Sequence, residues 1–478
     1  MVGDPGVRRE FPQSGSLVAR TARRAVPWLR GVVRGVLGAL AFDPVELLAS
    51  SGLFDRSFYA AQAGITADLR GSVVHYLKRG AAAGYSPNRL FDPAAYLADY
   101  PDVAAAAIAP FLHFVAHGLR EGRRPTVLPD CAACISAISP EVLAGRRILS
   151  QAQSAGWHRE PPSVWAGSLA CVYASSLGNF FFRDIADRLA DALRADGVTV
   201  LRLDQNSVRP DGTAIDLIVA PHEFFHLGGG RAWQERAEAA RAVMLNTEQP
   251  GTHWYLLALR YAGPATTLVD MSPQSAVLLH EAGRVRSGYL PLGWGPGERP
   301  QDRDRWRDRP IDALFLGTLT PRRSRALARL APALARYRCF IHAPTGSGRP
   351  LPGGRHDIGR DESLSLARRA KVILNIHRDE FPYLEWHRMI TMGIQQGAVV
   401  LSEPTLPSPG IVPGRHFLSA GVDDMPLHLE RLLDTPFGDE LSGRVAALAA
   451  DELPTLFDLR AELRALAFLY QAGFHGTA

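Results

Sequence analysis

The sequence predicts an α/β protein with two domains built on parallel sheets, preceded by a small all-helical domain made of a repeat. Three observations indicate this class. Short apolar runs alternate with amphipathic stretches between residues 169 and 433, as in strand–helix–strand units whose strands are buried on both faces. A polar linker rich in Gly, Pro and Arg, residues 293–310, divides these units into two groups. Before them, two similar stretches recur at an offset of 37 to 38 residues.

The composition of the 478-residue chain indicates a globular protein of several domains. With 46% hydrophobic and 21% charged residues, and four cysteines, it predicts neither a membrane-spanning segment nor a disulfide framework. We therefore expect a cytoplasmic location. Seven arginines and two acidic residues within the first 40 positions account for the net charge of +5. Because the rest of the chain is balanced, we expect no nucleic-acid partner.

The N-terminal residues 1–45 form a basic, amphipathic arm. Within residues 17–40, Arg20, Arg23, Arg30 and Arg34 share one face of a helical projection. Such a pattern is typical of a helix lying on an anionic membrane surface. The arm therefore predicts a peripheral position at the inner face of the membrane. A helix docked on the protein itself, or a disordered arm, is the alternative.

Residues 46–130 contain two copies of one helical unit. The matching pairs are LFDRSFY at 53–59 with LFDPAAY at 90–96, and VVHYLKRGAAAGYSP at 73–87 with FLHFVAHGLREGRRP at 111–125. Each copy predicts a helix capped by Asp55 or Asp92, then a second helix closed by glycine. We interpret His75 and His113, one in each copy, as packed side chains and not as metal ligands. A linker, residues 131–165, follows.

The first α/β domain, residues 166–300, places polar residues after several buried strands. The expected strands are Leu169–Ala174, Val198–Leu203, Asp216–Ala220, Ala242–Asn246, Thr267–Asp270 and Gly288–Leu290. Because ligands collect at the carboxyl ends of parallel strands, His222 and Glu223 are candidates for a general base, with Glu248 next. The alternatives are that a backbone carbonyl orients His222, and that Glu248 caps the helix at 251–261.

Gly178 and Asn179 precede a helix in the same domain. Backbone N–H groups at a helix start can bind a donor phosphate or an acceptor hydroxyl. Gly178 could also serve only to permit a tight turn.

The second α/β domain, residues 305–435, is centred on KVILNIHRDEFPYLEWHRMITMGIQQGAVVLSEP at 371–404. We expect strands at Asp312–Leu316, Tyr337–His342, Lys371–Ile376 and Ala398–Leu401. A three-turn helix is expected over Glu385–Gln396, with Gly397 as its left-handed end. Helices in residues 436–478 complete the chain.

This stretch resembles the nucleotide-sugar-binding half of bacterial GT-B glycosyltransferases, which have two Rossmann-like domains. The motifs that carry the resemblance are Asn375-x-His377, Glu385-x-x-Arg388 and the strand exit from Gly397 to Glu403. The FD-x-x-Y and H-Y-x-x-x-G units resemble repeats that sit beside the catalytic part of such enzymes. The resemblance implies a donor site made of Gly317, Thr318, Arg322, His377, Arg378, Glu385, Arg388, Ser402 and Glu403.

The resemblance implies an enzyme that moves a sugar from a nucleotide-sugar to a glycan or lipid-linked acceptor in surface polysaccharide synthesis. It implies a hexosyltransferase with no cofactor and no metal, in which arginines and helix dipoles stabilise the departing diphosphate. Thr391 stands where related families have an acid, and a pair of glutamates eight residues apart is missing. The stereochemical outcome therefore stays open. A non-catalytic glycan- or nucleotide-sugar-binding scaffold, or a nucleotide-sugar epimerase of related fold, is the alternative.

Overall fold

A computed structural model describes the chain from residue 43 to residue 475 with gaps. The described residues are 43–51, 53–88, 91–118, 121, 123, 165–234, 236–250, 252–263, 266–283, 286–296, 298–300, 306–345, 358–378 and 382–475. They belong to two compact units. The first comprises described residues 43–87 and 93–116, and the second comprises the remainder. Most of the N-terminal arm and of the linker before residue 165 lies outside the described residues.

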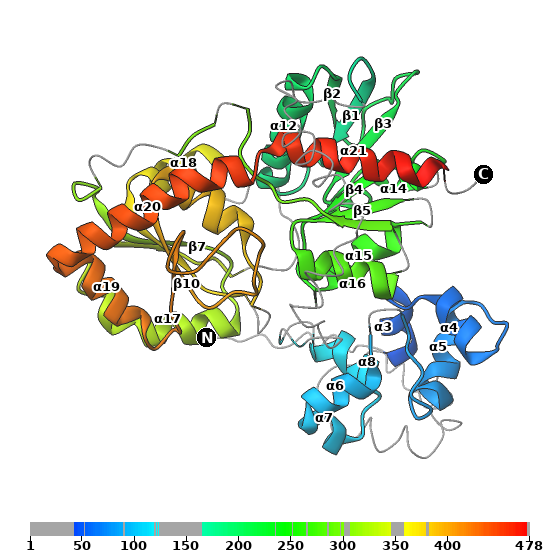
Figure 1. The fold of residues 1–478 in the computed structure, drawn as a ribbon. Helices are drawn as coiled ribbons and strands as arrows, with labels where there is room; N and C mark the ends of the chain where they lie inside the picture. Colours follow the sequence, from blue (N-terminus) through cyan, green and yellow to red (C-terminus); the bar gives the residue numbers. More distant parts are fainter. Residues whose placement is uncertain are drawn as a thin grey trace, which may run out of the picture. The chain divides into compact units, whose positions relative to one another are not determined.

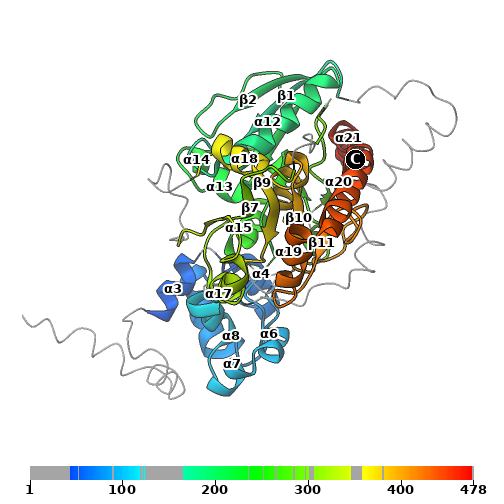
Figure 2. The ribbon, with the colours of Figure 1, turned by 90° about the vertical axis from the view of Figure 1, so that its left-hand side faces the viewer.

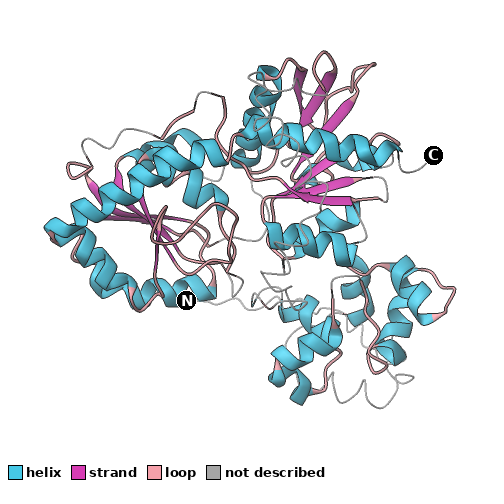
Figure 3. Cartoon of the chain, in the orientation of Figure 1, coloured by secondary structure: helices cyan, strands magenta, loops and turns pink. Residues whose placement is uncertain are grey.

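The first unit is all-helical, as the repeat predicts (Figure 3). Its helices are α3 (Pro44–Ser50), α4 (Arg56–Ala63), α5 (Leu69–His75), η2 (Tyr76–Gly80), α6 (Pro93–Asp99), α7 (Pro101–Ala106) and α8 (Pro110–His113), and η3 (Phe114–Gly118) follows α8. The π-helical turns η2 and η3 begin 38 residues apart, at the same point of each copy.

Each repeat histidine binds the tyrosine of its own copy. The Tyr59 hydroxyl lies 2.8 Å from His75 Nδ1, and the Tyr96 hydroxyl lies 3.0 Å from His113 Nδ1. A Cβ atom on Gly80 would lie 2.0 Å from the Tyr59 hydroxyl, so the first copy needs glycine there. The interpretation of both histidines as packed side chains is confirmed.

The second unit contains two parallel sheets, which confirms the predicted pair of Rossmann-like α/β domains (Figure 1). The first sheet has the order β2-β1-β3-β4-β5-β6. Its strands are β1 (Leu169–Tyr173), β2 (Thr199–Leu203), β3 (Ile215–Val219), β4 (Val243–Asn246), β5 (Thr267–Asp270) and β6 (Arg286–Tyr289). The helices between them are α12 (Phe180–Ala195), α13 (Pro221–Phe224), α14 (Gly230–Gln234), η4 (Ala239–Arg241), α15 (His253–Tyr261) and α16 (Pro273–Gly283).

The second sheet has the order β11-β10-β9-β7-β8, and its strands are also parallel. They are β7 (Ile311–Leu316), β8 (Cys339–His342), β9 (Ala370–Asn375), β10 (Val399–Ser402) and β11 (Leu418–Ser419). Helices α17 (Pro321–Leu334), α18 (Arg360–Arg368) and α19 (Met425–Asp434) belong to this domain. The central strands β7, β9 and β10 are almost completely buried, as their continuous apolar runs predict.

The C-terminal helices α20 (Pro436–Leu456) and α21 (Leu459–His475) connect the second domain to the first (Figures 1 and 2). Arg464 on α21 forms a two-pronged ion pair with Asp196 at the end of α12, with both distances 2.7 Å. The Tyr470 ring meets the Trp165 ring edge-on. The C-terminal helix α21 therefore braces the first domain.

One predicted helix is wrong. In place of three α-helical turns over 385–396, the chain makes one π-helical turn, η5 (His387–Thr391), and one 3-10 turn, η6 (Ile394–Gln396). At Gly393 a Cβ atom would lie 2.2 Å from Val400 Cγ2 and 2.6 Å from the Met389 carbonyl oxygen. This close approach to β10 interrupts the regular helix. Gly397 has φ +69°, which confirms its predicted left-handed conformation.

No helix among the described residues combines the length and the apolar composition needed to cross a membrane.

Candidate active site

The carboxyl edge of the first sheet brings together the candidates that follow β1, β3 and β4. Because all strands run parallel, the residues after them meet at one edge. Gly178 and Asn179 lie between β1 and α12, His222 and Glu223 lie on α13, and Glu248 follows β4. Two close groupings form there.

The first grouping joins Glu223 to the loop before α12. The Glu223 carboxylate accepts hydrogen bonds from the Asn179 backbone N–H (3.0 Å to Oε2) and from Asn179 Nδ2 (2.9 Å to Oε1). A Cβ atom on Gly178 would lie only 1.6 Å from Glu223 Oε2. A side chain at position 178 would therefore clash with the Glu223 carboxylate, so glycine is needed here whether or not the turn requires it. Burial raises the pKa of Glu223 to about 7.

The backbone places Glu223 sharply against the strand end. Ala220, between β3 and α13, has φ +53°, a left-handed conformation that is unfavourable for a residue with a Cβ atom. This bend starts α13 immediately after the strand and turns both His222 and Glu223 into the protein, where they are 2% and 3% exposed.

The second grouping is His222 with Glu248. His222 Nε2 lies 3.4 Å from Glu248 Oε1, and the imidazole packs against the rings of Phe182 and Trp254. The Glu248 side chain is 15% exposed, so it is the more accessible member of the pair. The alternative that Glu248 caps the next helix does not hold, because Thr252 is the N-cap and accepts from the Tyr255 backbone N–H.

The same edge contains a buried carboxylate that was not among the predicted site residues. Asp270, the last residue of β5, accepts hydrogen bonds from Asn246 Nδ2 (2.5 Å), from the Ser272 backbone N–H (2.8 Å) and from the Ser275 hydroxyl. Burial raises the pKa of Asp270 to about 7. The sequence signal for Asp270 and Asn246 was their position as the last residues of two apolar strands.

The carboxyl edge of the second sheet holds its carboxylates between arginines. Arg322 on α17 binds both oxygens of Glu403, at 2.7 and 2.8 Å, and donates to the His377 carbonyl oxygen. Glu403 also accepts from the His377 backbone N–H at 2.7 Å. The hydrogen bonds from Arg322 and His377 and the charge of Arg322 outweigh burial and lower the pKa of Glu403. These three predicted donor-site residues thus form one cluster.

Glu385 lies between two further arginines. Its carboxylate is 2.5 Å from Arg388 Nη1 and 3.1 Å from Arg323 Nη2, and the charges of these arginines outweigh burial to lower its pKa. Both guanidinium groups lie over the Phe315 ring. A Cβ atom on Gly317 would come within 2.8 Å of Arg388 Nη2, so glycine leaves room for this arginine. Arg323, which follows the predicted Arg322, was not predicted.

The remaining predicted donor-site residues support this edge through short-range contacts. The Thr318 carbonyl oxygen accepts from Arg323 Nη1 (3.1 Å), and the Arg378 carbonyl oxygen accepts from the Thr320 hydroxyl (2.7 Å). Ser402 at the end of β10 accepts from Asn375 Nδ2 (2.9 Å). His377 Nε2 donates to the Pro404 carbonyl oxygen at 2.8 Å. Burial lowers the pKa of His377.

The Tyr383 hydroxyl lies close enough to carboxylates of both edges to be affected by their charges. Tyr383 precedes η5 in the second domain and is 3% exposed. Burial, together with the negative charges of Asp270, Glu248 and Glu385, raises the pKa of its hydroxyl well above the ordinary value. Two of these carboxylates belong to the first domain and one to the second, so carboxylates from both edges act on one side chain. Tyr383 was not predicted from the sequence.

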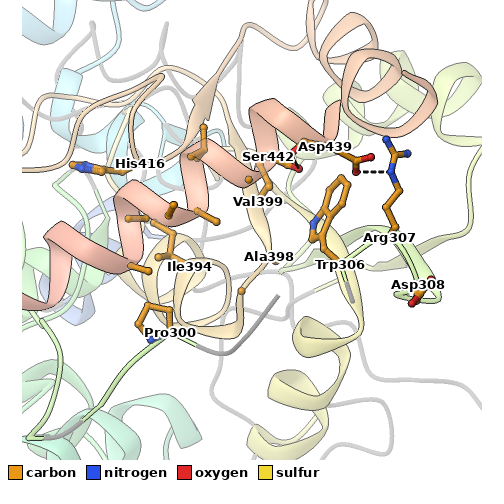
Figure 4. Close-up of a pocket in the computed structure, with 17 residues that line it drawn as sticks. Pro300, Trp306, Arg307, Asp308, Ile394, Ala398, Val399, His416, Asp439 and Ser442 are labelled. Carbon is orange, nitrogen blue, oxygen red and sulfur yellow. Dashed lines mark hydrogen bonds and ion pairs between the residues drawn. The ribbon is translucent and has the colours of Figure 1, made fainter. Parts of the chain in front are cut away.

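A separate cavity of about 560 Å³ lies away from this region (Figure 4). It is lined by Trp306, Ala398 and Val399 and by small residues of α20, with the Arg307–Asp439 ion pair (2.5 Å) at its rim. Val399 begins β10 and Ser402 ends it, so the cavity lies at the amino edge of the second sheet, opposite the candidate site. Among the described residues, no group of three or more His, Cys, Asp or Glu side chains is arranged to hold a metal ion.

Comparison with known proteins gives structural likenesses only. No protein-family model matches the chain, and no curated protein matches it. A glycosyltransferase from Rickettsia africae is 10% identical, with a TM-score of 0.37 over 65% of this chain and 99% of its own. The Anabaena protein HepE, in complex with UDP and glucose, is 8% identical, with a TM-score of 0.39 over 65% and 99%. The lipopolysaccharide outer core galactosyltransferase WaaB is 12% identical, with a TM-score of 0.35 over 64% and 99%.

Proposed function

We propose that this protein is a glycosyltransferase that moves a sugar, of the hexose class, from a nucleotide-sugar to a hydroxyl group of a glycan or lipid-linked acceptor. Surface polysaccharide synthesis is the process that fits such acceptors. The observation that carries the proposal is the pairing of two different strand-end edges in one unit. One edge holds buried carboxylates that accept hydrogen bonds from neutral groups, and the other holds carboxylates paired with arginines.

In this proposal the second domain binds the donor. The loop at Gly317 and Thr318 and the guanidinium groups of Arg322 and Arg388 suit a diphosphate, because arginine forms paired hydrogen bonds with phosphate oxygens. Arg388 is held by Glu385 and Arg322 by Glu403, so both are positioned before the ligand arrives. As the bond between sugar and diphosphate breaks, these positive charges stabilise the departing diphosphate without a metal ion. Glu385 is also the residue we assign to the ribose hydroxyls.

The first domain activates the acceptor. The hydroxyl oxygen of the acceptor forms a bond to the sugar carbon while the bond between that carbon and the diphosphate breaks, and the hydroxyl proton must leave. We assign the uptake of this proton to the pair of His222 and Glu248, whose Nε2 and Oε1 atoms lie 3.4 Å apart. Glu248 is the more exposed member and is assigned the contact with the acceptor, and His222 positions it. Glu223, with its pKa of about 7, is the second candidate.

Release of the nucleoside diphosphate from the donor tests whether the protein transfers a sugar. Purified protein is first screened by thermal shift against a panel of nucleotide-sugars, and the stabilising donors are then incubated with a pool of acceptors. The proposal predicts release of the nucleoside diphosphate that depends on an acceptor. If the donor binds but no nucleoside diphosphate is released and the sugar is unchanged, the protein is a scaffold. If the sugar is converted without release of the nucleoside diphosphate, the protein is an epimerase.

The N-terminal arm is proposed to hold the protein at the inner face of the membrane, on the basis of the four arginines that share one helical face at positions 20, 23, 30 and 34. Each cationic residue near an anionic surface contributes on the order of 1 kcal/mol, and salt screens the attraction. Flotation with anionic liposomes should weaken with added salt and vanish when residues 1–40 are deleted. Equal flotation of the deletion variant would contradict the proposal.

A further inference from the structure

A second cavity, of about 340 Å³, lies where α12, the linker between the α/β domains, α18 and η6 come together. We call this the linker pocket. Its lining includes Arg188 of α12, Glu298 of the linker, Arg360 and Arg368 of α18, and Thr391 and Gln395 in the segment after β9. It is therefore built from elements of both domains.

The linker pocket is distinct from the candidate active site. Arg368 ends α18 two residues before β9 begins, and Gln396, which also lines the pocket, lies three residues before β10 begins. Both residues are thus at the amino edge of the second sheet. His377 and Glu403 follow the same two strands at the carboxyl edge.

Arginines outnumber carboxylates around the linker pocket. Arg188, Arg299, Arg360 and Arg368 line it, against Asp184 and Glu298. Two ion pairs use both carboxylates: Arg188 with Glu298 at 2.8 Å and Arg360 with Asp184 at 2.5 Å. Arg368 donates only to the neutral Gln396 Oε1, at 2.9 Å, and has no carboxylate partner among the described residues. Asp361 also pairs with Arg360, at 3.3 Å, and the four arginines still outnumber three carboxylates, so the pocket carries an excess of positive charge.

Two buried donors on residues that line the pocket have no hydrogen-bond partner in the described part of the chain. Gln395 is 8% exposed, and its Nε2 has no hydrogen-bond partner among the described residues. The same holds for Nε of Arg188, whose terminal nitrogens bind Glu298, the Gly293 carbonyl oxygen and the Thr391 hydroxyl. A buried donor without a partner is unfavourable, and a shift of these two side chains toward the pocket would let a bound acceptor satisfy them.

We propose that the linker pocket binds a soluble, phosphate-bearing anion through Gln395, Arg188 and Arg368. Phosphate oxygens accept from the planar guanidinium group in pairs, and they would also accept from an amide N–H₂. The ligand would touch α12 of the first domain and α18 of the second, and so would stabilise this arrangement of the two domains. This inference stands apart from the proposed sugar transfer and does not depend on it.

Two variants remove donors while leaving the ion pairs in place. Gln395→Leu deletes the amide, and Arg368→Gln deletes an exposed guanidinium group. Inorganic pyrophosphate is titrated calorimetrically into the full-length chain and its variants. Each variant should weaken binding by about tenfold or more, as expected for a charge-assisted hydrogen bond. Arg329→Gln, which removes an exposed arginine of α17, should leave the affinity unchanged. Unchanged affinity in both pocket variants, or no binding to the parent protein, would overturn the proposal.

Location is tested by soaking crystals of the full-length protein in tungstate, a heavy analogue of phosphate. An anomalous peak within hydrogen-bond distance of Gln395 Nε2 is expected, and it should be absent in Gln395→Leu crystals. Peaks confined to the carboxyl edges of the sheets would overturn the proposal. So would binding of phosphatidic acid vesicles without binding of pyrophosphate, because the pocket would then belong to a lipid headgroup.

Discussion

The two α/β domains share a parallel-sheet design but treat the carboxylates at their carboxyl edges in opposite ways. At the first edge, Glu223 and Asp270 are buried among neutral donors, and their pKa values rise to about 7. At the second edge, Glu385 and Glu403 are also mostly buried, yet their pKa values are lowered. The difference comes from the partners: asparagine and serine side chains at the first edge, arginines at the second.

Position at a strand end therefore does not by itself define the chemistry of a residue. A carboxyl group whose pKa is near 7 can exchange a proton at working pH. A carboxylate held between arginines stays ionised, and its main effect is to position those arginines. The first edge is therefore suited to proton transfer, and the second to binding an anion.

The largest expected effect is on turnover at the first edge. Glu248→Gln should lower kcat by about 10²- to 10⁴-fold, because a glutamine cannot take up the acceptor proton. Donor affinity should stay nearly unchanged, since we assign donor binding to the other domain. Steady-state kinetics and calorimetry on the same samples check both statements.

Glu440→Gln, at an exposed position on α20, is the matched control and should behave like the parent protein. Near-normal turnover in Glu248→Gln would contradict the assignment. The base would then be His222 or Glu223, or the enzyme would need none at this position.

At the second edge, Glu385→Gln should weaken donor binding by roughly tenfold or more. The substitution removes the charge that holds Arg323 and Arg388, and the loss of such a buried hydrogen-bond partner costs about 1–3 kcal/mol. Isothermal titration with the donor measures the change. Glu430→Gln, which removes an exposed partner of Arg336, is the control. An unchanged dissociation constant in Glu385→Gln would remove Glu385 from the donor site.

The smallest expected effect is a change in the pH dependence of stability. The pKa of Glu223 is about 7 in the folded protein, against 4.5 for an ordinary glutamate. Between these values the folded state binds more protons at this site than the unfolded state, so this group makes the protein less stable as pH rises. The slope cannot exceed about 1.4 kcal/mol per pH unit for one group.

Glu223→Gln removes this contribution. The unfolding free energy of the variant, relative to that of the parent, should therefore increase from pH 4.5 to pH 7. Histidines with lowered pKa values, such as His387 at about 4, act in the opposite direction, but they cancel in the difference. Urea denaturation across this pH range provides the measurement. Two parallel stability curves would show that Glu223 has an ordinary pKa.

Strands and their polar ends could be predicted from the sequence because burial on both faces leaves a continuous apolar run in the chain. His222, Glu223, Glu403 and His377 follow such runs directly. Glu385 and Arg388 do not follow a strand directly, and they are predicted from the family motif and from their place in the segment after the strand.

The contacts between distant parts of the chain could not be predicted. Asn246 and Asp270 are partners because β4 and β5 are neighbours in register, a fact that neither local segment contains. Position 178 needs glycine because the carboxylate of Glu223, far along the chain, packs against it. Similarly, the helix expected over 385–396 is interrupted because Gly393 packs directly against Val400, which periodicity within the helix does not reveal.

The position of a bound nucleoside diphosphate tests the division of labour between the two edges most directly. The nucleoside diphosphate that gives the largest thermal shift is soaked into crystals of the full-length protein. Its phosphates should lie at the carboxyl edge of β7 and β9, in contact with the Gly317–Thr318 loop and the guanidinium group of Arg322 or Arg388. Phosphates bound instead at the first edge, beside Asn179 and Glu223, would contradict the account.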